Sequence, residues 1–308
     1  MRVSPLFFIG APEAMATYNT EDSKKLLSTS FKGSGARKRH LLACRIKSMF
    51  KGGAYEAVAN NLETLCLFIG YPRSGHSLVG SLLDAHPEMI VAHEADLLDY
   101  FQEGFSRRQL LYVLLENSRV FTRHGRAWTD YSYEVPNQYN GRFETLKVIG
   151  DKKGLKTAFA LDEDPGLAER LRECMGVPVK LVHVTRNPFD NISTIKMRED
   201  VTLDKSIEIY FGIADAVKGQ KERWPEEHWF DLRHEDLFVD AHTHLKALVE
   251  YFGREASEQY LSDCASIIFD QPNQSRHKLA DEWTPERIAE IEARLQHYPF
   301  LASYRFAV

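Results

Sequence analysis

The amino-acid sequence predicts an α/β protein with a central parallel sheet and helices on both faces. Three observations lead to this class. Apolar, strand-like stretches alternate with helical patterns along the chain, which favours parallel pairing. One stretch runs into a glycine-bounded loop and then a helix, and another ends in an arginine at a helix start. Open α/β sheets bind ligands where the carboxyl ends of their strands meet, so we expect both features at one edge.

Composition agrees with a protein of this class. The chain has 308 residues, of which 44% are hydrophobic, enough for one large α/β domain with an extension. A net charge of −5 argues against nucleic-acid binding. The sequence lacks a run of about 18 apolar residues, and its separated cysteines form no CxxC pair and indicate no metal site. We therefore expect a cytoplasmic protein with reduced thiols and no transmembrane segment.

The chain divides into an N-terminal extension, residues 1–62, and a main domain, residues 63–308. The extension is partly basic, with many Lys and Arg and no acid between Lys24 and Lys51. Two interpretations of this run stay open: a solvated lead-in, or a segment that docks on a membrane or a partner. A short helix is expected over Leu41–Phe50, ended by Gly52 and Gly53.

The main domain contains five expected strands and several helices. The strands share short apolar runs bounded by polar or glycine residues: Leu65–Tyr71, Ile90–Ala92, Leu146–Ile149, Val179–Thr185 and His228–Leu232. The stretch 123–143 is rich in aromatic residues but has no clean period, so we expect a long aromatic loop there. The last helix should begin at Pro285, since proline suits the first helical position, and run through Leu295.

The first functional motif follows the first expected strand. Gly70 and Gly75 have the spacing of the phosphate-binding loop GxxxxGK[ST], and Ser77 supplies its hydroxyl, but His76 replaces the lysine. Backbone N–H groups and the helix N-terminus can hold an oxyanion here. A mostly neutral histidine is a poor partner for a triphosphate, whereas Arg73 is always charged. The sequence therefore predicts an anion site for a ligand other than ATP.

The second motif follows the fourth expected strand. This strand leads into Arg186, Asn187 can cap the next helix, Pro188 suits its first position, and Asp190 favours its positive end. An arginine at this position points into the ligand crevice of an open sheet. Two positive features in one crevice predict a ligand with two separate anionic groups.

Both motifs resemble those of the PAPS-dependent sulfotransferases. Tyr71-Pro-Arg-Ser-Gly-His-Ser77 is similar to the family's 5′-phosphosulfate loop, and Arg186-Asn-Pro, followed by a hydroxyl residue, to its 3′-phosphate motif. The resemblance covers about Leu65 to Thr194. It implies a P-loop-kinase-like fold and transfer of SO₃ from 3′-phosphoadenosine 5′-phosphosulfate (PAPS) to a hydroxyl or amine, leaving the bisphosphate PAP. His76 departs from the pattern, since most relatives have Thr, Ser or Asn there.

The resemblance implies a set of residues that bind the nucleotide. Arg186 would act with a hydroxyl eight residues later, at Thr194; Ser193 is the alternative, and only one of them should face the phosphate because helix neighbours differ by about 100°. Near the end, Ser275-Arg-His-Lys278 resembles a basic loop that closes over the nucleotide. The expected cofactor-binding residues are Arg73, Ser74, Gly75, His76, Ser77, Arg186, Ser193, Thr194, Arg276 and His277.

The expected catalytic residues are a base and charge-stabilising cations. Ala92-His-Glu94 resembles the segment in which tyrosylprotein and some other sulfotransferases carry a catalytic Glu, so Glu94 is the first choice of base and His93 the second. A dry pocket would raise the pKa of Glu94 into a useful range. Lys152 would neutralise charge on the sulfuryl or leaving group, Lys153 would be solvated, and Arg73 would meet the leaving phosphate. Simple ion pairing is the alternative for these groups.

Three functions stay open. The first is a sulfotransferase acting on a small soluble metabolite or carbohydrate, which needs no metal because a sulfuryl group carries less charge than a terminal phosphoryl. The second is a P-loop-like small-molecule kinase using ATP and magnesium, and the third a non-catalytic nucleotide-binding protein. The aromatic stretch 128–143 suits a sugar, a phenol or a polycyclic acceptor. The sequence does not indicate the oligomeric state.

Overall fold

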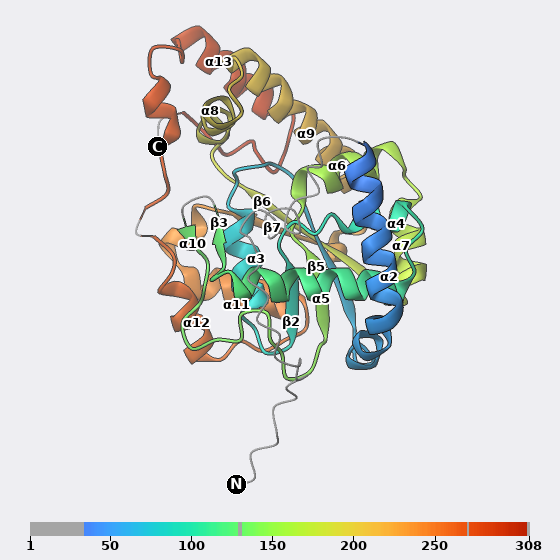
Figure 1. Cartoon of the computed structure of the whole chain (residues 1–308). Helices are drawn as coiled ribbons and strands as arrows, with labels where there is room; N and C mark the ends of the chain where they lie inside the picture. The colour runs from blue at the N-terminus through green and yellow to red at the C-terminus, as the bar shows by residue number, and fades with distance from the viewer. Residues whose placement is uncertain (1–33, 129–130, 270, 307–308) are drawn as a thin grey trace.

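The computed structural model describes residues 34–128, 131–269 and 271–306 (Figure 1). Its core is a five-stranded sheet in the order β2-β5-β1-β6-β7, in which every pairing is parallel. This confirms the predicted fold class. The strands are β1 (Thr64–Ile69), β2 (Met89–Ala92), β5 (Val148–Asp151), β6 (Val179–Thr185) and β7 (Trp229–Arg233).

The strands lie within about two residues of the predicted ranges, and β5 differs most. It continues to the buried Asp151, beyond the apolar run that the prediction used. The Asp151 carboxylate accepts the backbone N–H groups of Ala95, at 2.9 Å, and Leu97, at 2.8 Å, in the segment after β2. A charged residue is accommodated in this strand because these two N–H groups bind its carboxylate.

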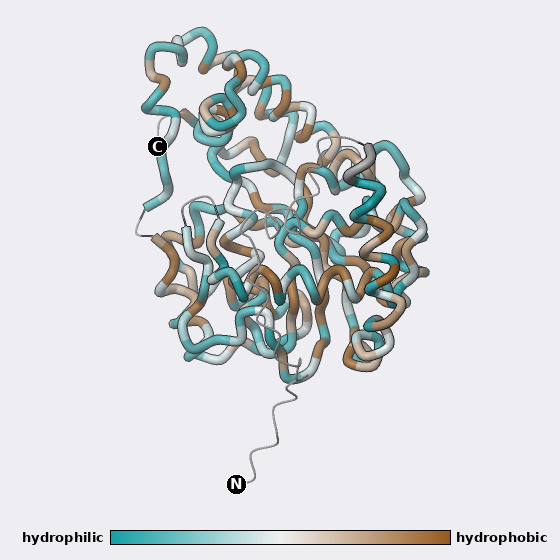
Figure 2. Tube along the Cα trace, in the orientation of Figure 1, coloured by the Kyte–Doolittle hydropathy of each residue, from teal (hydrophilic) through white to brown (hydrophobic). Residues whose placement is uncertain are grey.

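Helices cover both faces of the sheet (Figure 1). Side chains of β1 alternate between two apolar clusters, with Leu65 and Leu67 in one and Cys66 and Phe68 in the other, as a strand period of two requires. Figure 2 shows apolar segments concentrated along the central strands. The first cluster includes residues of α2 (Ser34–Val58), α4 (Leu97–Gln102), α5 (Arg107–Arg123), α6 (Gly154–Glu163), α7 (Leu167–Met175), α8 (Pro188–Glu199), α9 (Leu203–Arg223) and α13 (Pro285–Leu295). The second includes residues of α3 (His76–Asp84), α10 (Asp236–Val239), α11 (Ala241–Tyr251) and α12 (Glu258–Ala265).

The N-terminal helix is longer than the sequence predicted. α2 encloses the expected range Leu41–Phe50 and runs through Gly53. It packs on α5, where the Tyr55 hydroxyl donates to Glu116 at 3.0 Å and Cys44 is buried. This packing outweighs the helix penalty of about 1 kcal/mol for glycine, which is why the expected break is absent. Residues 1–33 lie outside the described part of the chain, and the boundary at residue 62 stays a prediction.

Shorter elements complete the fold. The aromatic segment holds a two-residue antiparallel pair, β3 (Ala127–Trp128) and β4 (Tyr131–Ser132), followed by turns. Two 3₁₀ turns, η1 (Glu226–His228) and η2 (Ser275–Leu279), precede β7 and α13. The prediction of α13 is confirmed at both ends. Within the described ranges, none of the helices combines the length and apolar character that a membrane span requires.

Candidate active site

The glycine loop between β1 and α3 forms a tight turn at the carboxyl edge of the sheet. Gly75 has a φ of 100°, and a Cβ atom there would collide with the imidazole of His234, so this position favours glycine. The Ser74 hydroxyl donates to the Tyr71 carbonyl at 2.9 Å and holds the turn. Ser74 is buried, whereas Gly75 and Ser77 are half-buried. The loop therefore turns tightly against the His234 ring, at the start of α3.

His76 takes the place of the lysine in this loop but does not supply a charge. Its ring packs edge-on against Phe68, with centroids 5.6 Å apart, and lies close to Gly154. Burial, together with the nearby charge of Lys152, lowers the pKa of His76 to about 3. The side chain therefore lies in the core as a neutral ring. Its backbone N–H, at the start of α3, is the group available to an anion.

Arg73 lies at the outer side of the loop. Its Nη2 is 3.1 Å from Oε1 of Glu199, at the end of α8. Both side chains are substantially exposed, at 33% and 50%. Exposed ion pairs of this kind contribute about 0–1 kcal/mol, so Arg73 is held only weakly in this position.

Arg186 follows β6 and is a buried cation. Its Nη1 donates to the Arg73 carbonyl at 3.2 Å and contacts the Thr194 hydroxyl at 3.5 Å, and Nη2 donates to the Asn273 carbonyl. Within the described residues, its Nε has no hydrogen-bond partner and no carboxylate forms an ion pair with it. Burial lowers the pKa of Arg186. Its hydrogen-bond partners are thus neutral groups, and the nearby Asp190 and Glu235 carboxylates form no direct ion pair with it within the described residues.

Two other buried arginines show the contrast. Arg126 pairs with Asp84 at 2.6 Å, and Arg276 pairs with Asp190, also at 2.6 Å, with all four side chains nearly inaccessible. Arginine and aspartate are seldom fully buried unless paired. Arg186 departs from this rule, which makes it the described arginine best suited to receive an external anion.

The two hydroxyls of α8 point to different places. Thr194 lies beside Arg186, and its hydroxyl donates to the Asp190 carbonyl at 2.7 Å and lies 2.9 Å from the Ser275 hydroxyl. Ser193 is fully buried and accepts the indole N–H of Trp283 at 2.9 Å. The structure therefore brings Thr194, rather than Ser193, to the arginine.

The η2 segment is attached to α8 by Arg276. Its backbone N–H and its Nη1 both donate to the Asp190 carboxylate, at 2.9 and 2.6 Å. Arg276 is 2% exposed, so its guanidinium holds the segment in place rather than extending to the surface. The next residue, His277, is exposed.

A second charged group lies on the other side of the loop. Lys152 Nζ donates to the Ser77 hydroxyl at 3.0 Å and pairs with Glu94 at 2.8 Å. Lys153 Nζ pairs with the other Glu94 oxygen at 3.0 Å and lies 3.4 Å from Asp96. The expectation of a solvated Lys153 is wrong, because its ammonium lies between these two carboxylates.

The electrostatics of Glu94 also differ from expectation. Burial favours the neutral acid, but the two lysine charges outweigh it, and the pKa of Glu94 lies well below its ordinary value. The sequence suggested a raised pKa because neither lysine could be placed beside the carboxylate. Glu94 is therefore ionised and paired, and its basicity is low while both lysines remain in contact.

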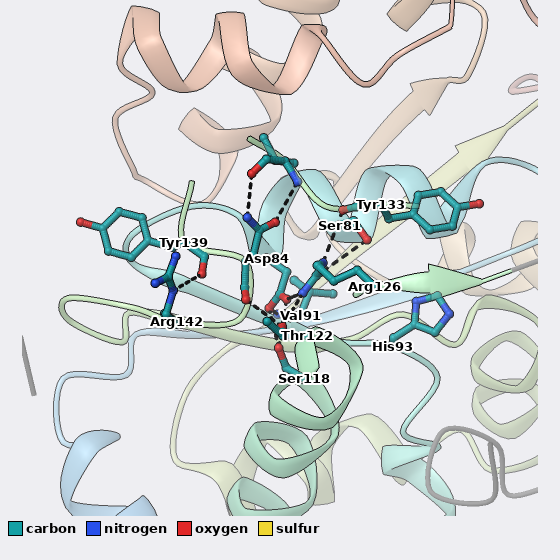
Figure 3. Close-up of polar contacts among 12 residues, drawn as sticks. Ser81, Asp84, Val91, His93, Ser118, Thr122, Arg126, Tyr133, Tyr139 and Arg142 are labelled. Carbon is teal, nitrogen blue, oxygen red and sulfur yellow. Dashed lines mark hydrogen bonds and ion pairs between the residues drawn. The ribbon is translucent and has the colours of Figure 1, made fainter. Parts of the chain in front are cut away.

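The His93 ring packs against the start of the aromatic segment. It stacks on Phe121, with centroids 4.1 Å apart, and meets Trp128 edge-on at 4.9 Å. Burial lowers the pKa of His93 well below its ordinary value, and Nε2 has no partner among the described residues. Figure 3 shows the side chain of Arg126, at the start of the aromatic segment, bonded to Asp84. His93 is thus a neutral, enclosed imidazole.

Sequence reasoning missed His234, which follows β7 at the same sheet edge. Its backbone N–H donates to the Thr185 carbonyl at 2.7 Å, and its ring covers Gly75. Burial and the charge of Arg186 lower the pKa of His234 to about 3, and Nδ1 has no partner within the described residues. The sequence could have indicated His234 through its position just after the expected strand His228–Leu232, because the carboxyl ends of parallel strands meet at the edge of the sheet where ligands bind.

Comparisons with known proteins give a family. A family model described as the sulfotransferase family matches residues 67–258. No curated protein matches the chain. Among solved structures, sulfotransferase STF9 from Mycobacterium avium is 12% identical, with 90% of this chain and 83% of that chain covered and a TM-score of 0.48. Mouse sulfotransferase SULT7A1 complexed with PAP is also 12% identical, with 77% and 84% covered and a TM-score of 0.44.

The family assignment rests on the family model and not on these distant structures. The model spans more than half of the 308 residues. Its range also encloses the glycine loop and the Arg186 motif. The chain therefore belongs to the sulfotransferase family.

Proposed function

We propose that this sulfotransferase moves a sulfuryl group from PAPS to a hydroxyl or amine of a small metabolite or carbohydrate. The observation that carries the proposal is Arg186, a buried cation without an acidic partner among the described residues. It lies at the same sheet edge as the glycine loop, whose N–H groups form a separate anion site. Two such sites fit a nucleotide with separate 3′ and 5′ anionic groups.

In this proposal the described residues hold PAPS at two places. Arg186 and Thr194 bind the 3′-phosphate, with the unpartnered Nε of Arg186 available as a further donor. The backbone N–H groups of residues 74–77 hold the 5′ group at the positive end of α3. Arg276 and His277 border the 3′ side, Arg276 by fixing η2 against α8.

Bound PAPS supplies an activated sulfuryl group whose transfer leaves a phosphate behind. Lys152 lies between Ser77 and Glu94 and provides a fixed positive charge at the loop. Arg73 can exchange its exposed Glu199 partner for the leaving phosphate at little cost. Such groups act by positioning and by stabilising charge in an in-line displacement, and losing one typically costs about 10²–10³ in rate.

We propose Glu94 as the base, with His93 as the second candidate. Glu94 is ionised and half-buried, so it can accept the acceptor proton once the lysine charges are shared with an incoming anion. His93 is neutral but enclosed by Phe121 and Trp128. Turnover that disappears in Glu94→Gln and survives in His93→Gln would support the first assignment, and the reverse would support the second.

A kinase function is less compatible with the site. The position of the ATP-binding lysine holds a neutral, core-packed imidazole. A triphosphate would lose the fixed cation that this loop normally provides. We therefore propose PAPS rather than ATP as the donor.

Calorimetric titration with PAP, beside ATP plus magnesium, tests the donor. We expect PAP binding that Arg186→Ala weakens by about 2 kcal/mol or more, the scale for a charged hydrogen-bonded pair. Arg233→Ala is the matched control, because Arg233 ends the neighbouring strand β7 but is exposed. Binding of ATP instead, or equal PAP binding by both variants, would overturn the proposal. PAP binding without transfer to any acceptor would favour a non-catalytic protein.

A further inference from the structure

The outward face of α2 carries large apolar side chains. Leu42, Ile46, Met49 and Phe50 are exposed at 58%, 48%, 67% and 85%, and we call these four residues the apolar stripe. Helix geometry places them within an arc of about 100°, opposite the buried Cys44. Four of the nine exposed large apolar residues in the described part of the chain thus lie on nine residues of one helix. Such clustering marks an interaction surface, unlike single exposed apolar residues.

Basic residues of the same helix lie close to the apolar stripe, with Arg39 within its arc and Lys38 and Lys47 to either side of it. Lys38, Arg39, Lys47 and Lys51 are all exposed. No ion pair joins any of these four to an acid within the described ranges. From Lys24 to Lys51 the sequence has nine Lys and Arg and no Asp or Glu, although the whole chain has a net charge of −5. The positive charge of this face is therefore local and opposite in sign to the protein as a whole.

We propose that the apolar stripe and its basic flanks dock on an anionic lipid bilayer. Apolar side chains bordered by Lys and Arg suit the headgroup boundary of such a membrane, where basic groups are attracted to acidic lipids. A protein partner fits less well, because protein interfaces are depleted in lysine and a projecting helix face would need a matching groove.

The inner face of α2 keeps the helix on the protein, and none of the described residues covers the apolar stripe on its outer face. Figure 1 shows α2 at the outside of the molecule, and Figure 2 shows polar and apolar residues alternating along it. Arg37 pairs with Glu103 at 2.7 Å, and Tyr55 binds Glu116 on α5. The helix is thus formed and anchored before it meets a membrane, so docking needs no folding step.

Co-sedimentation of the full chain with vesicles tests the proposal. We expect binding to phosphatidylcholine mixed with phosphatidylserine, little binding to phosphatidylcholine alone, and weakening by salt. Two variants, Ile46→Ser with Phe50→Ser and Arg39→Glu with Lys47→Glu, should each lower the affinity by on the order of tenfold or more. No binding to the acidic vesicles, or equal binding by these variants, would overturn the proposal.

A control variant distinguishes binding through the α2 face from nonspecific binding of the protein to vesicles. Val239 is 86% exposed on α10 and Lys246 is exposed on α11, so Val239→Ser with Lys246→Glu changes the same chemistry elsewhere. This variant should bind acidic vesicles like the unaltered chain. An equal thermal unfolding midpoint for all variants shows that folding is intact. A loss as large in the control variant would overturn the assignment to α2.

A spin label tests whether something other than a membrane covers the apolar stripe. The label is attached at Met49→Cys. Cys174→Ser removes the one described cysteine that is not buried, since Cys44, Cys66 and Cys264 are buried. The label should be accessible to a water-soluble relaxation agent in solution and become protected when acidic vesicles are added. Protection without vesicles would mean that another part of the chain or a second copy covers the face. Sedimentation equilibrium would then distinguish these two cases, and either would overturn the proposal.

Discussion

The two sides of the proposed nucleotide site satisfy their charges in different ways. We call the residues around Arg186 the 3′ side and those around Arg73 and Lys152 the transfer side. On the 3′ side, Arg186 is buried without an acidic partner among the described residues, and the helix that faces it is fixed by the buried Asp190–Arg276 pair. On the transfer side, Arg73 and Lys152 are each paired with a glutamate. The 3′ side is therefore assembled in advance for an anion, whereas the transfer side must exchange partners when one arrives.

In the proposed function, this difference assigns nucleotide affinity to one side and reaction rate to the other. A preassembled donor loses little conformational freedom on binding, so it contributes directly to affinity. A cation that leaves a carboxylate for the ligand gains only the difference between two pairings, but its new position can favour the transition state. We expect changes on the 3′ side to affect folding and nucleotide binding, and changes on the transfer side to affect turnover.

The largest expected effect concerns the buried pair of the 3′ side. Asp190→Asn leaves the Arg276 charge buried without its counter-ion and should lower the free energy of unfolding by about 3–5 kcal/mol. Denaturant titration measures the change. Asp204→Asn is the control, because Asp204 pairs with Arg287 at 2.7 Å on the surface and should contribute less than about 1 kcal/mol. Similar losses in both variants would contradict a preassembled 3′ side.

The next effect concerns Lys152 on the transfer side. Lys152→Ala removes the cation between Ser77 and Glu94 and should lower turnover by about 10²–10³, with a much smaller change in PAP affinity. Steady-state rates with an acceptor found by screening measure the first quantity, and calorimetry the second. Lys156→Ala is the control, since this lysine lies at the outer end of the same charged group, 45% exposed. A large loss of PAP affinity without a loss of turnover would reverse the assignment of the two sides.

Acid should destabilise the fold through the buried imidazole of the glycine loop. The folded pKa of His76 is about 3, whereas an unfolded histidine has a pKa of about 6.5. Below pH 6.5 the unfolded state therefore binds more protons, so stability present at pH 7 is lost as the pH falls toward 3. At pH 5, His76 alone should lower the free energy of unfolding by about 2 kcal/mol.

Denaturant titrations at pH 7 and pH 5 measure this effect. His76→Asn should reduce the difference in unfolding free energy between the two pH values by about 2 kcal/mol. An unchanged difference in His76→Asn would mean that the imidazole is not enclosed as the structure places it.

Local sequence signals predicted the strands and helices that position this site, but not which of its charged groups pair. Short apolar runs and glycine or proline boundaries predicted all five strands, and the helical period indicated that one of two adjacent hydroxyls faces Arg186. The lowered pKa of Glu94 could not be predicted, because it depends on Lys152 and Lys153, which contact Glu94 from the segment after β5. The length of α2 was also missed, since packing on α5 stabilises it through glycine. Both features depend on contacts between segments far apart in the sequence, which local patterns do not reveal.

The smallest effect gives the sharpest test of partner exchange. Glu199→Gln removes the acid that holds Arg73 in free protein, so PAP affinity should rise, by about 0.2–1 kcal/mol. The same substitution in an Arg73→Ala background should have no effect, because the gain depends on a released arginine; this double-mutant cycle isolates the coupling. A gain that persists without Arg73 would indicate general repulsion between Glu199 and the ligand. A fall in affinity would mean that Arg73 binds PAP only when Glu199 holds it. The transfer side would then be preassembled, as the 3′ side is.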